Sequence, residues 1–194
     1  MGKSRVEAFS DGVIAIIITI MVLDLRVPSA GSWAALSPLA PVFLAYVLSF
    51  VYLGIYWSNH HHMMQTCSQV TGAILWANLH LLFWLSLFPA SMAWMDRAHF
   101  ASIPVGVYGI VLLMAAVAYW ILQQLIIRTQ GRDSLLRRAV GRDWKGKLSP
   151  LLYLAAIGLA ARWPGASLGI YAAVALVWLV PDRRIERALR SVPD

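Results

Sequence analysis

Charged residues and cysteine are scarce in this chain of 194 residues. Asp, Glu, Lys and Arg make up 13% of it, whereas about a quarter of the residues of an ordinary soluble domain are charged. The single cysteine, Cys67, excludes both an intramolecular disulfide framework and a cysteine-based metal cluster. Hydrophobic residues make up 60%, which is more apolar surface than a soluble protein of this length can bury. The composition therefore predicts a protein that lipid largely covers.

Acidic residues are outnumbered by basic ones, and the formal net charge is +7. A strongly basic protein can bind nucleic acid, but its basic side chains then gather on one face or along one helix. Here they stand in short segments between apolar runs, as the orientation signals of membrane proteins do. We therefore expect no nucleic-acid partner.

Six apolar stretches indicate an all-α membrane protein, with six transmembrane helices in one domain over residues 1–194. The expected spans are roughly 6–26, 39–59, 71–94, 103–127, 148–162 and 166–181. A helix needs about 20 residues to cross a hydrocarbon core of ~30 Å. The last two stretches are shorter and are joined by Arg162-Trp163-Pro164-Gly165, so they form either two tilted spans or a re-entrant hairpin.

Lysine and arginine are distributed unevenly over the two expected sides of the membrane. All but three precede the first apolar stretch, lie in the basic loop 128–147, or follow the last stretch. The three exceptions are Arg26, Arg97 and Arg162. Because basic segments stay on the cytoplasmic side, we predict that both termini and the loop 128–147 are cytoplasmic. The same loop is suited to attract anionic membrane lipid.

The first apolar stretch combines polar residues near its start with an aliphatic stripe. A carboxylate costs ~3 kcal/mol near the bilayer centre and less near a helix end, where Asp11 stands, so Asp11 needs hydrogen-bond partners. At about 100° per residue, Ile16, Ile20 and Leu23 share one narrow face. Thr19 lies beside it. The stripe is either a packing or lipid-facing seam, or a row of pore-lining side chains that gates by dewetting.

The residues that open this stretch resemble a known family. Arg5-x-x-x-Phe9-Ser10-Asp11 is similar to the motif at the start of the first membrane helix in the transmembrane protein 175 family of potassium-permeable channels. Further similar segments are Gly12-Val13-Ile14-Ala15-Ile16-Ile17-Ile18-Thr19, Val22-Leu23-Asp24-Leu25, Tyr56-Trp57-Ser58-Asn59-His60-His61, Leu75-Trp76-Ala77-Asn78-Leu79 and Phe88-Pro89. They cover roughly the first half of the chain, and the second half adds only compatible topology.

The resemblance implies a potassium-permeable cation channel, a homotetramer in which the first helix of each subunit lines a central pore. It assigns the pore constriction to Ile16, Ile20 and Leu23. It assigns to Thr19 the threonine layer linked to a modest preference for K⁺ over Na⁺. The Thr-Val-Gly-Tyr-Gly filter of ordinary potassium channels is missing from the family and from this sequence. The implied location is the plasma membrane of a bacterium, with monovalent cations as partners and no cofactor besides permeant K⁺.

The resemblance also implies a structural or gating network that joins the first helix to the second and third. Its expected members are Arg5, Phe9, Ser10, Asp11, Trp57, His60, His61 and Asn78. The simpler interpretations are an interfacial anchor for Trp57 and a bond within its own helix for Asn78. His60, His61 and His62 are consecutive and therefore point about 100° apart, so we do not expect them to converge on a metal ion.

Three other functions are weighed against a channel. A secondary transporter or proton-leak pathway is the main alternative, although transporters typically carry repeats and broken helices with ionisable groups near the midplane. The middle of the first helix is aliphatic instead. An enzyme is not expected, because no nucleophile with an adjacent base and no metalloprotease spacing occurs. A non-conducting scaffold stays open.

Overall fold

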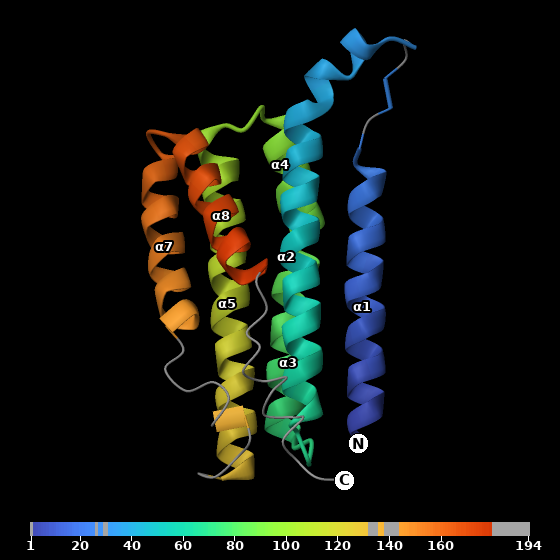
Figure 1. The fold of residues 1–194 in the computed structure, drawn as a ribbon, viewed down its shortest axis with the longest axis vertical. Coiled ribbons are helices and arrows are strands. Elements are labelled where there is room, and N and C mark those ends of the chain that lie inside the picture. Colours follow the sequence, from blue (N-terminus) through green and yellow to red (C-terminus); the bar gives the residue numbers. More distant parts are fainter. Residues whose placement is uncertain (1, 26, 29–30, 132–135, 138–143, 180–194) are drawn as a thin grey trace.

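The computed structural model describes residues 2–25, 27–28, 31–131, 136–137 and 144–179, and the regular structure within them is entirely helical (Figure 1). The helices are α1 (Lys3–Leu23), the short 3-10 helices η1 (Trp33–Ala35) and η2 (Ser37–Leu39), α2 (Ala40–Gln65), α3 (Gly72–Ser86), α4 (Phe88–Arg97), α5 (Ser102–Gln130), α7 (Trp144–Ala160) and α8 (Pro164–Leu179). They form an elongated bundle with their axes roughly aligned (Figure 1).

Four stretches are long and apolar enough to cross a membrane: Lys3–Leu23, Trp33–Gln65, Gly72–Arg97 and Ser102–Gln130. The helices α7 and α8 have 17 and 16 residues, which at 1.5 Å per residue is about 25 Å and less than the ~30 Å of a hydrocarbon core. They lie side by side against α5 (Figure 1).

The third expected span is divided in two. The helix α3 ends at Ser86, Leu87 forms the junction, and α4 begins at Phe88. Pro89 in the first turn of α4 has no N–H with which to continue the hydrogen bonds of α3. Proline is tolerated at such a position, because the first amides of a helix have no partner within it. The two helices together still give one membrane-crossing length.

A core rich in tyrosine lies between the two edges of the bundle. The helix α1 packs on α2, α3 and α4 at one edge, while α7 and α8 pack on α5 at the other (Figure 1). Tyr52, Tyr108 and Tyr171 are fully buried. The Tyr52 hydroxyl donates to the carbonyl of Tyr171 at 2.6 Å, and the Tyr108 hydroxyl lies 2.9 Å from the hydroxyl of Ser49. These bonds satisfy hydroxyls that would otherwise cost ~1–3 kcal/mol each when buried.

Two glycines stand where other residues are disfavoured, Gly109 by lack of space and Gly131 by its backbone conformation. At Gly109 in α5, a β-carbon would collide with the ring of Tyr171 on α8. The absence of a side chain there leaves room for the Tyr171 ring between the two helices. Gly131 follows the last turn of α5 with φ of 85°, a conformation that favours glycine and ends the helix.

The chain passes back and forth between two ends of the bundle, of which we call the one where α1 begins the N-terminal side (Figure 1). The described basic residues on or next to that side are Lys3, Arg5, Arg128, Arg137, Lys145 and Lys147. Those at the opposite side are Arg97 and Arg162. The other basic residues used to predict orientation lie outside the described residues: Arg26, Arg132, Arg138, Arg142, Arg183, Arg184, Arg187 and Arg190.

Candidate functional site: the first helix and its polar anchor

The helix α1 has one face that is packed into the bundle. The buried residues on this face are Val6, Ser10, Ile14, Ile17 and Met21, each at most 4% exposed. Their spacing of three or four residues places them on one side of the helix, against α2, α3 and α4. Four of the five are apolar, so this face holds α1 in the subunit by side-chain packing.

The opposite face of α1 is apolar and exposed along the outer edge of the bundle. Ile16, Ile20 and Leu23 are 59%, 46% and 82% exposed, so the described part of the subunit covers them only in part. They share a face as the spacing predicts. An exposed aliphatic row of this kind is suited to contact with lipid, with another subunit, or with a pore.

Thr19 stands beside this row and is also exposed. Its hydroxyl donates to the carbonyl of Ile16 at 2.9 Å, so its single proton is used within the helix. The lone pairs of its oxygen are therefore left to accept from outside the helix. An oxygen in that state is a suitable neighbour for a hard cation such as K⁺.

A buried chain of hydrogen bonds connects α1 to α3 and α2. The carboxamide of Asn78 donates from its nitrogen to the Ser10 hydroxyl at 2.9 Å, and the Ser10 hydroxyl donates to the Val6 carbonyl at 2.8 Å. The Asn78 oxygen lies 2.7 Å from Nε2 of His60. Because that oxygen can only accept, Nε2 of His60 must carry the proton. Ser10, Asn78 and His60 are each at most 1% exposed, so these contacts are shielded from water.

The second polar contact lies nearer the surface. The indole N–H of Trp57 on α2 donates to the carboxylate of Asp11 at 3.0 Å. The ring of Trp57 in turn stacks on His61, with centroids 6.4 Å apart. Trp57 is 48% exposed, so a molecule or subunit that packs against this surface can contact its indole directly. It gives Asp11 the partner that its place on a membrane helix requires.

The remaining expected members of the network are peripheral in the subunit. Phe9 is 53% exposed. Arg5 is exposed, and no hydrogen bond or ion pair joins its side chain to a described residue. His61 is exposed and shares a hydrogen bond of 2.9 Å with Gln65. Within the described residues, no three His, Cys, Asp or Glu side chains are placed to hold a metal ion.

Two further contacts hold the ends of α1 and were not predicted from the sequence. The ammonium of Lys3 donates to the carbonyl of Gln65 at 2.9 Å. At the other end, Arg97 lies 3.9 Å from the carboxylate of Asp24. Opposite charges at the far ends of the first and third apolar stretches were the available signal for the second contact. A bond to a backbone carbonyl leaves no such signal.

The fold and this site define a multi-pass helical membrane protein whose first helix joins a buried polar anchor to an exposed aliphatic face. Residues 5–89 match the family model described as endosomal/lysosomal potassium channel TMEM175. A protein of Chryseobacterium sp. (strain P1-3), named a potassium channel, is 54% identical over 191 residues, 98% of this chain and 100% of the relative. The chain belongs to the TMEM175 family.

A solved structure and a human relative extend the comparison. The crystal structure of a lysosomal potassium-selective channel TMEM175 homolog from Chamaesiphon minutus superimposes with a TM-score of 0.80 at 27% identity, covering 93% of this chain and 97% of that one. The human endosomal/lysosomal proton channel TMEM175 is 36% identical over 116 residues, which are 54% of this chain and 23% of the human protein. The family and the six-helix fold predicted from the sequence are confirmed.

Proposed function

We propose that this protein is a potassium-permeable cation channel in which four copies assemble around a common axis with α1 innermost. The observation that carries the proposal is the exposed aliphatic row of Ile16, Ile20 and Leu23 on a helix whose other face is fully packed. The proposal is supported by the potassium-channel names of the bacterial relatives, one of which aligns along nearly the whole chain. The same names favour a channel over a scaffold.

The aliphatic row would form a hydrophobic constriction along the pore. Rings of isoleucine and leucine offer no hydrogen bonds to water, so a narrow ring dewets and blocks ions until it widens. Such a constriction lacks the carbonyl oxygens that replace a hydration shell, so we expect only a modest preference for K⁺ over Na⁺. The outward lone pairs of Thr19, one turn away from Ile16 and Leu23, supply the polar contacts that give this preference.

The polar anchor would hold α1 at a fixed rotation and thereby orient the constriction. The bonds from Asn78 to Ser10 and to His60 are buried, whereas the bond from Trp57 to Asp11 is half-exposed. We assign the first set to structure and the Trp57 contact, with His61 stacked on it, to gating. Arg5 and Phe9 are exposed next to this contact and are assigned to packing between subunits.

The channel domain would span the plasma membrane of a bacterium with the N-terminal side in the cytoplasm. The excess of described basic residues on that side supports this orientation. The C-terminus, predicted on the same side, lies outside the described residues. The stretch between α5 and α7 is basic, and we propose that anionic lipid is its partner.

A proton-leak pathway is the second candidate. It is favoured by the name of the human relative, an endosomal/lysosomal proton channel. Protons can pass along ordered water in a wetted pore that is too narrow for a hydrated cation. A pH-sensitive dye inside liposomes, in the absence of K⁺ and Na⁺ gradients, separates this activity from potassium flux.

Flux through liposomes containing the purified protein tests the proposed function. We expect K⁺ flux to exceed Na⁺ flux modestly, and Ile16→Asn to raise both because a polar side chain wets the constriction. Val22→Asn is the matched control, since Val22 is 45% exposed on the same helix but lies off the row. Folded, oligomeric protein that passes neither ion, or an Ile16→Asn variant with unchanged flux, would refute the proposal.

A further inference from the structure

The aliphatic constriction proposed above has no means of its own to distinguish cations from anions. Rings of isoleucine and leucine exclude any hydrated ion until they wet, because they carry neither charge nor hydrogen-bonding groups. Thr19 adds a hydroxyl oxygen beside the row but no net charge. Cation channels without a carbonyl filter place rings of aspartate or glutamate along the path of the ion. A preference for cations therefore calls for a carboxylate on the same side of α1 as the exposed row.

The helix α1 and its C-cap residue carry three carboxylates, and one of them lies on the side of the row. At about 100° per residue, nine positions turn a helix to its opposite face, so Glu7 points away from Ile16. Asp11 points away from Ile20 for the same reason. Asp24, the C-cap residue, keeps helical backbone angles and follows Ile20 by four positions. It is therefore the next residue after Ile20 on the same ridge of the helix.

Asp24 also borders the groove that runs along the row between α1 and α4. The groove has a volume of about 600 Å³ and is open at the surface. Ile16 and Ile20 line its apolar part, and Asp24 and Arg97 line it where α1 and α4 end. A second recess of about 310 Å³ shares Asp24 and Arg97 and is lined by Asp96 as well. Water and ions can therefore reach the Asp24 carboxylate from the side of the row.

The ion pair between Asp24 and Arg97 is loose. Nη2 of Arg97 lies 3.9 Å from Oδ1 of Asp24, farther than the ~2.7–2.9 Å of a charge-assisted hydrogen bond. The side chain of Arg97 is 71% exposed and that of Asp24 is 30% exposed, so water competes with the pair. Arg97 therefore offsets only part of the negative charge that Asp24 presents to the groove.

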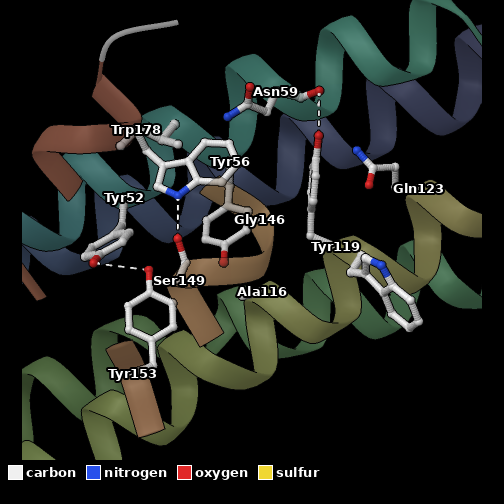
Figure 2. Close-up of a pocket in the computed structure, with 12 residues that line it drawn as sticks. Tyr52, Tyr56, Asn59, Ala116, Tyr119, Gln123, Gly146, Ser149, Tyr153 and Trp178 are labelled. Carbon is white, nitrogen blue, oxygen red and sulfur yellow. Dashed lines mark hydrogen bonds between the residues drawn. The ribbon is translucent and has the colours of Figure 1, made fainter. Parts of the chain in front are cut away.

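The edge of the bundle formed by α7 and α8 offers a cation no such group, because neither helix contains an acidic residue. Figure 2 shows the pocket that these helices form with α2 and α5, and its lining residues are uncharged. The Tyr153 hydroxyl donates to the Tyr52 hydroxyl, and the Trp178 indole donates to the Ser149 hydroxyl. The ammonium of Lys145 lies 5.9 Å from the centroid of the Trp178 ring. A cation at this edge would meet a like charge.

We propose that Asp24 determines the preference of the channel for cations over anions. In the tetramer its four copies form a ring of negative charge at the pore end opposite the N-terminal side, which attracts K⁺ and repels anions. Arg97 of each subunit weakens this ring by pairing with Asp24. The inference rests on the proposed pore along α1. It leaves the modest preference for K⁺ over Na⁺ with Thr19 and assigns charge selectivity to a residue beyond the constriction.

Two substitutions that break the same ion pair test the proposal, because they should change K⁺ conductance in opposite directions. Asp24→Asn removes the negative charge and Arg97→Gln removes its counter-charge. The full chain is recorded in planar bilayers of neutral lipid. At ~10 mM KCl we expect conductance to fall about threefold in Asp24→Asn and to rise in Arg97→Gln, because a charged pore mouth changes the local cation concentration. Both differences should vanish at ~1 M KCl, where the Debye length is ~3 Å instead of ~30 Å.

The reversal potential under a KCl gradient measures charge selectivity separately. It should move toward zero in Asp24→Asn, since Cl⁻ is then admitted, and should stay at the wild-type value in Asp24→Glu, which keeps the charge. Arg162→Gln is the control for Arg97→Gln, because it removes a positive charge on the same side of the bundle but at the turn between α7 and α8 (Figure 1). It should leave both properties unchanged.

Three results would overturn the proposal, and each has a different meaning. Conductance changes of the same sign in Asp24→Asn and Arg97→Gln would make the ion pair a structural contact only. Wild-type conductance and reversal potential in Asp24→Asn would show that ions do not pass this residue. Folded, oligomeric wild-type protein without any conductance would refute the proposed channel itself, and this result is obtained before any variant is recorded.

Discussion

Asn78 shows how far one side chain can determine the packing of three helices. Its nitrogen donates to Ser10 on α1, and its oxygen accepts from His60 on α2. Leucine would offer neither contact and aspartate would lose the donor, so the residue type follows from the two partners. In a membrane the alternative to such bonds is an unsatisfied polar group in hydrocarbon, which costs several kcal/mol. The anchor therefore restricts the rotation of α1 more than apolar packing alone would.

Substitutions at Asp11 test the role of its hydrogen bond with Trp57. Replacing Asp11 with Ala removes the acceptor of the Trp57 indole N–H, whereas Asp11→Asn keeps an oxygen there. We expect Asp11→Ala to weaken assembly or change the rate of K⁺ flux, with the ratio of K⁺ to Na⁺ flux retained, because Asp11 is not part of the exposed row. Asp11→Asn should stay close to the wild type. Size-exclusion chromatography and liposome flux measure both properties, and an Asp11→Ala protein with wild-type assembly and flux would exclude the assigned role.

The helices α1 and α5 differ in how much of their surface is packed against other helices. The helix α1 needs one packed face and one free face, and its sequence separates the two cleanly. The helix α5 is surrounded on more sides, and small residues along it, such as Ala115 and Ala118, are fully buried. Small residues let helices approach closely in membranes, where dispersion contacts drive their association. At Gly109 of α5, the ring of Tyr171 of α8 occupies the space of the missing side chain.

Gly109→Ala is the corresponding test for the helix pair α5 and α8. The added methyl would push against the Tyr171 ring, and overpacking of this kind costs ~1–3 kcal/mol. We expect a lower midpoint of thermal unfolding in detergent. Gly158→Ala is the matched control, because no atom lies within 4 Å of its added β-carbon and alanine favours helix. Equal midpoints for the two variants would show that α8 does not pack on α5 as described.

As a whole, the subunit has a packed interior and, along the outer face of α1, an exposed apolar edge. The outer surface of α1 borders a groove shared with α4, lined by Ile16, Ile20 and Ala93 among others. On a monomer in a membrane, this edge would meet only lipid. In the proposed tetramer it would meet the pore and the neighbouring subunit, which accounts for an aliphatic row beside a threonine and beside the motif that begins at Arg5.

Much of this arrangement follows from the sequence, for physical reasons that differ from part to part. The membrane spans can be predicted from the sequence because about 20 apolar residues are needed to cross a bilayer. The sequence predicts that Ser10 and Asp11 have polar side chains of other helices as partners, since polar groups on membrane helices must pair. Which histidine joins Asn78 was not, because it depends on the rotation of α2, and the structure selects the buried His60.

Other features depend on the junctions between helices, which a pattern of hydropathy does not contain. The division of the third span at Leu87 was not predicted, because Pro89 within an apolar run is compatible with either one helix or two. The oligomeric state is a property of several chains and stays a proposal.

The central claim, that K⁺ crosses along the exposed face of α1, is tested most directly by a reactive thiol on that face. Cys67, the only native cysteine, is 2% exposed. Burial raises the pKa of its thiol, so it stays protonated and unreactive near neutral pH. Cys67→Ser removes it and keeps a donor to the carbonyl of Gln69.

In that background, Leu23→Cys places the thiol at the 82% exposed end of the row, and Leu154→Cys places it on α7 as a control. A bulky cationic methanethiosulfonate is added to liposomes during K⁺ flux, and mass spectrometry measures the modified fraction. The account predicts that modification of Leu23→Cys blocks K⁺ flux and that Leu154→Cys keeps it. Undiminished flux through protein fully modified at position 23 would contradict a pore lined by α1.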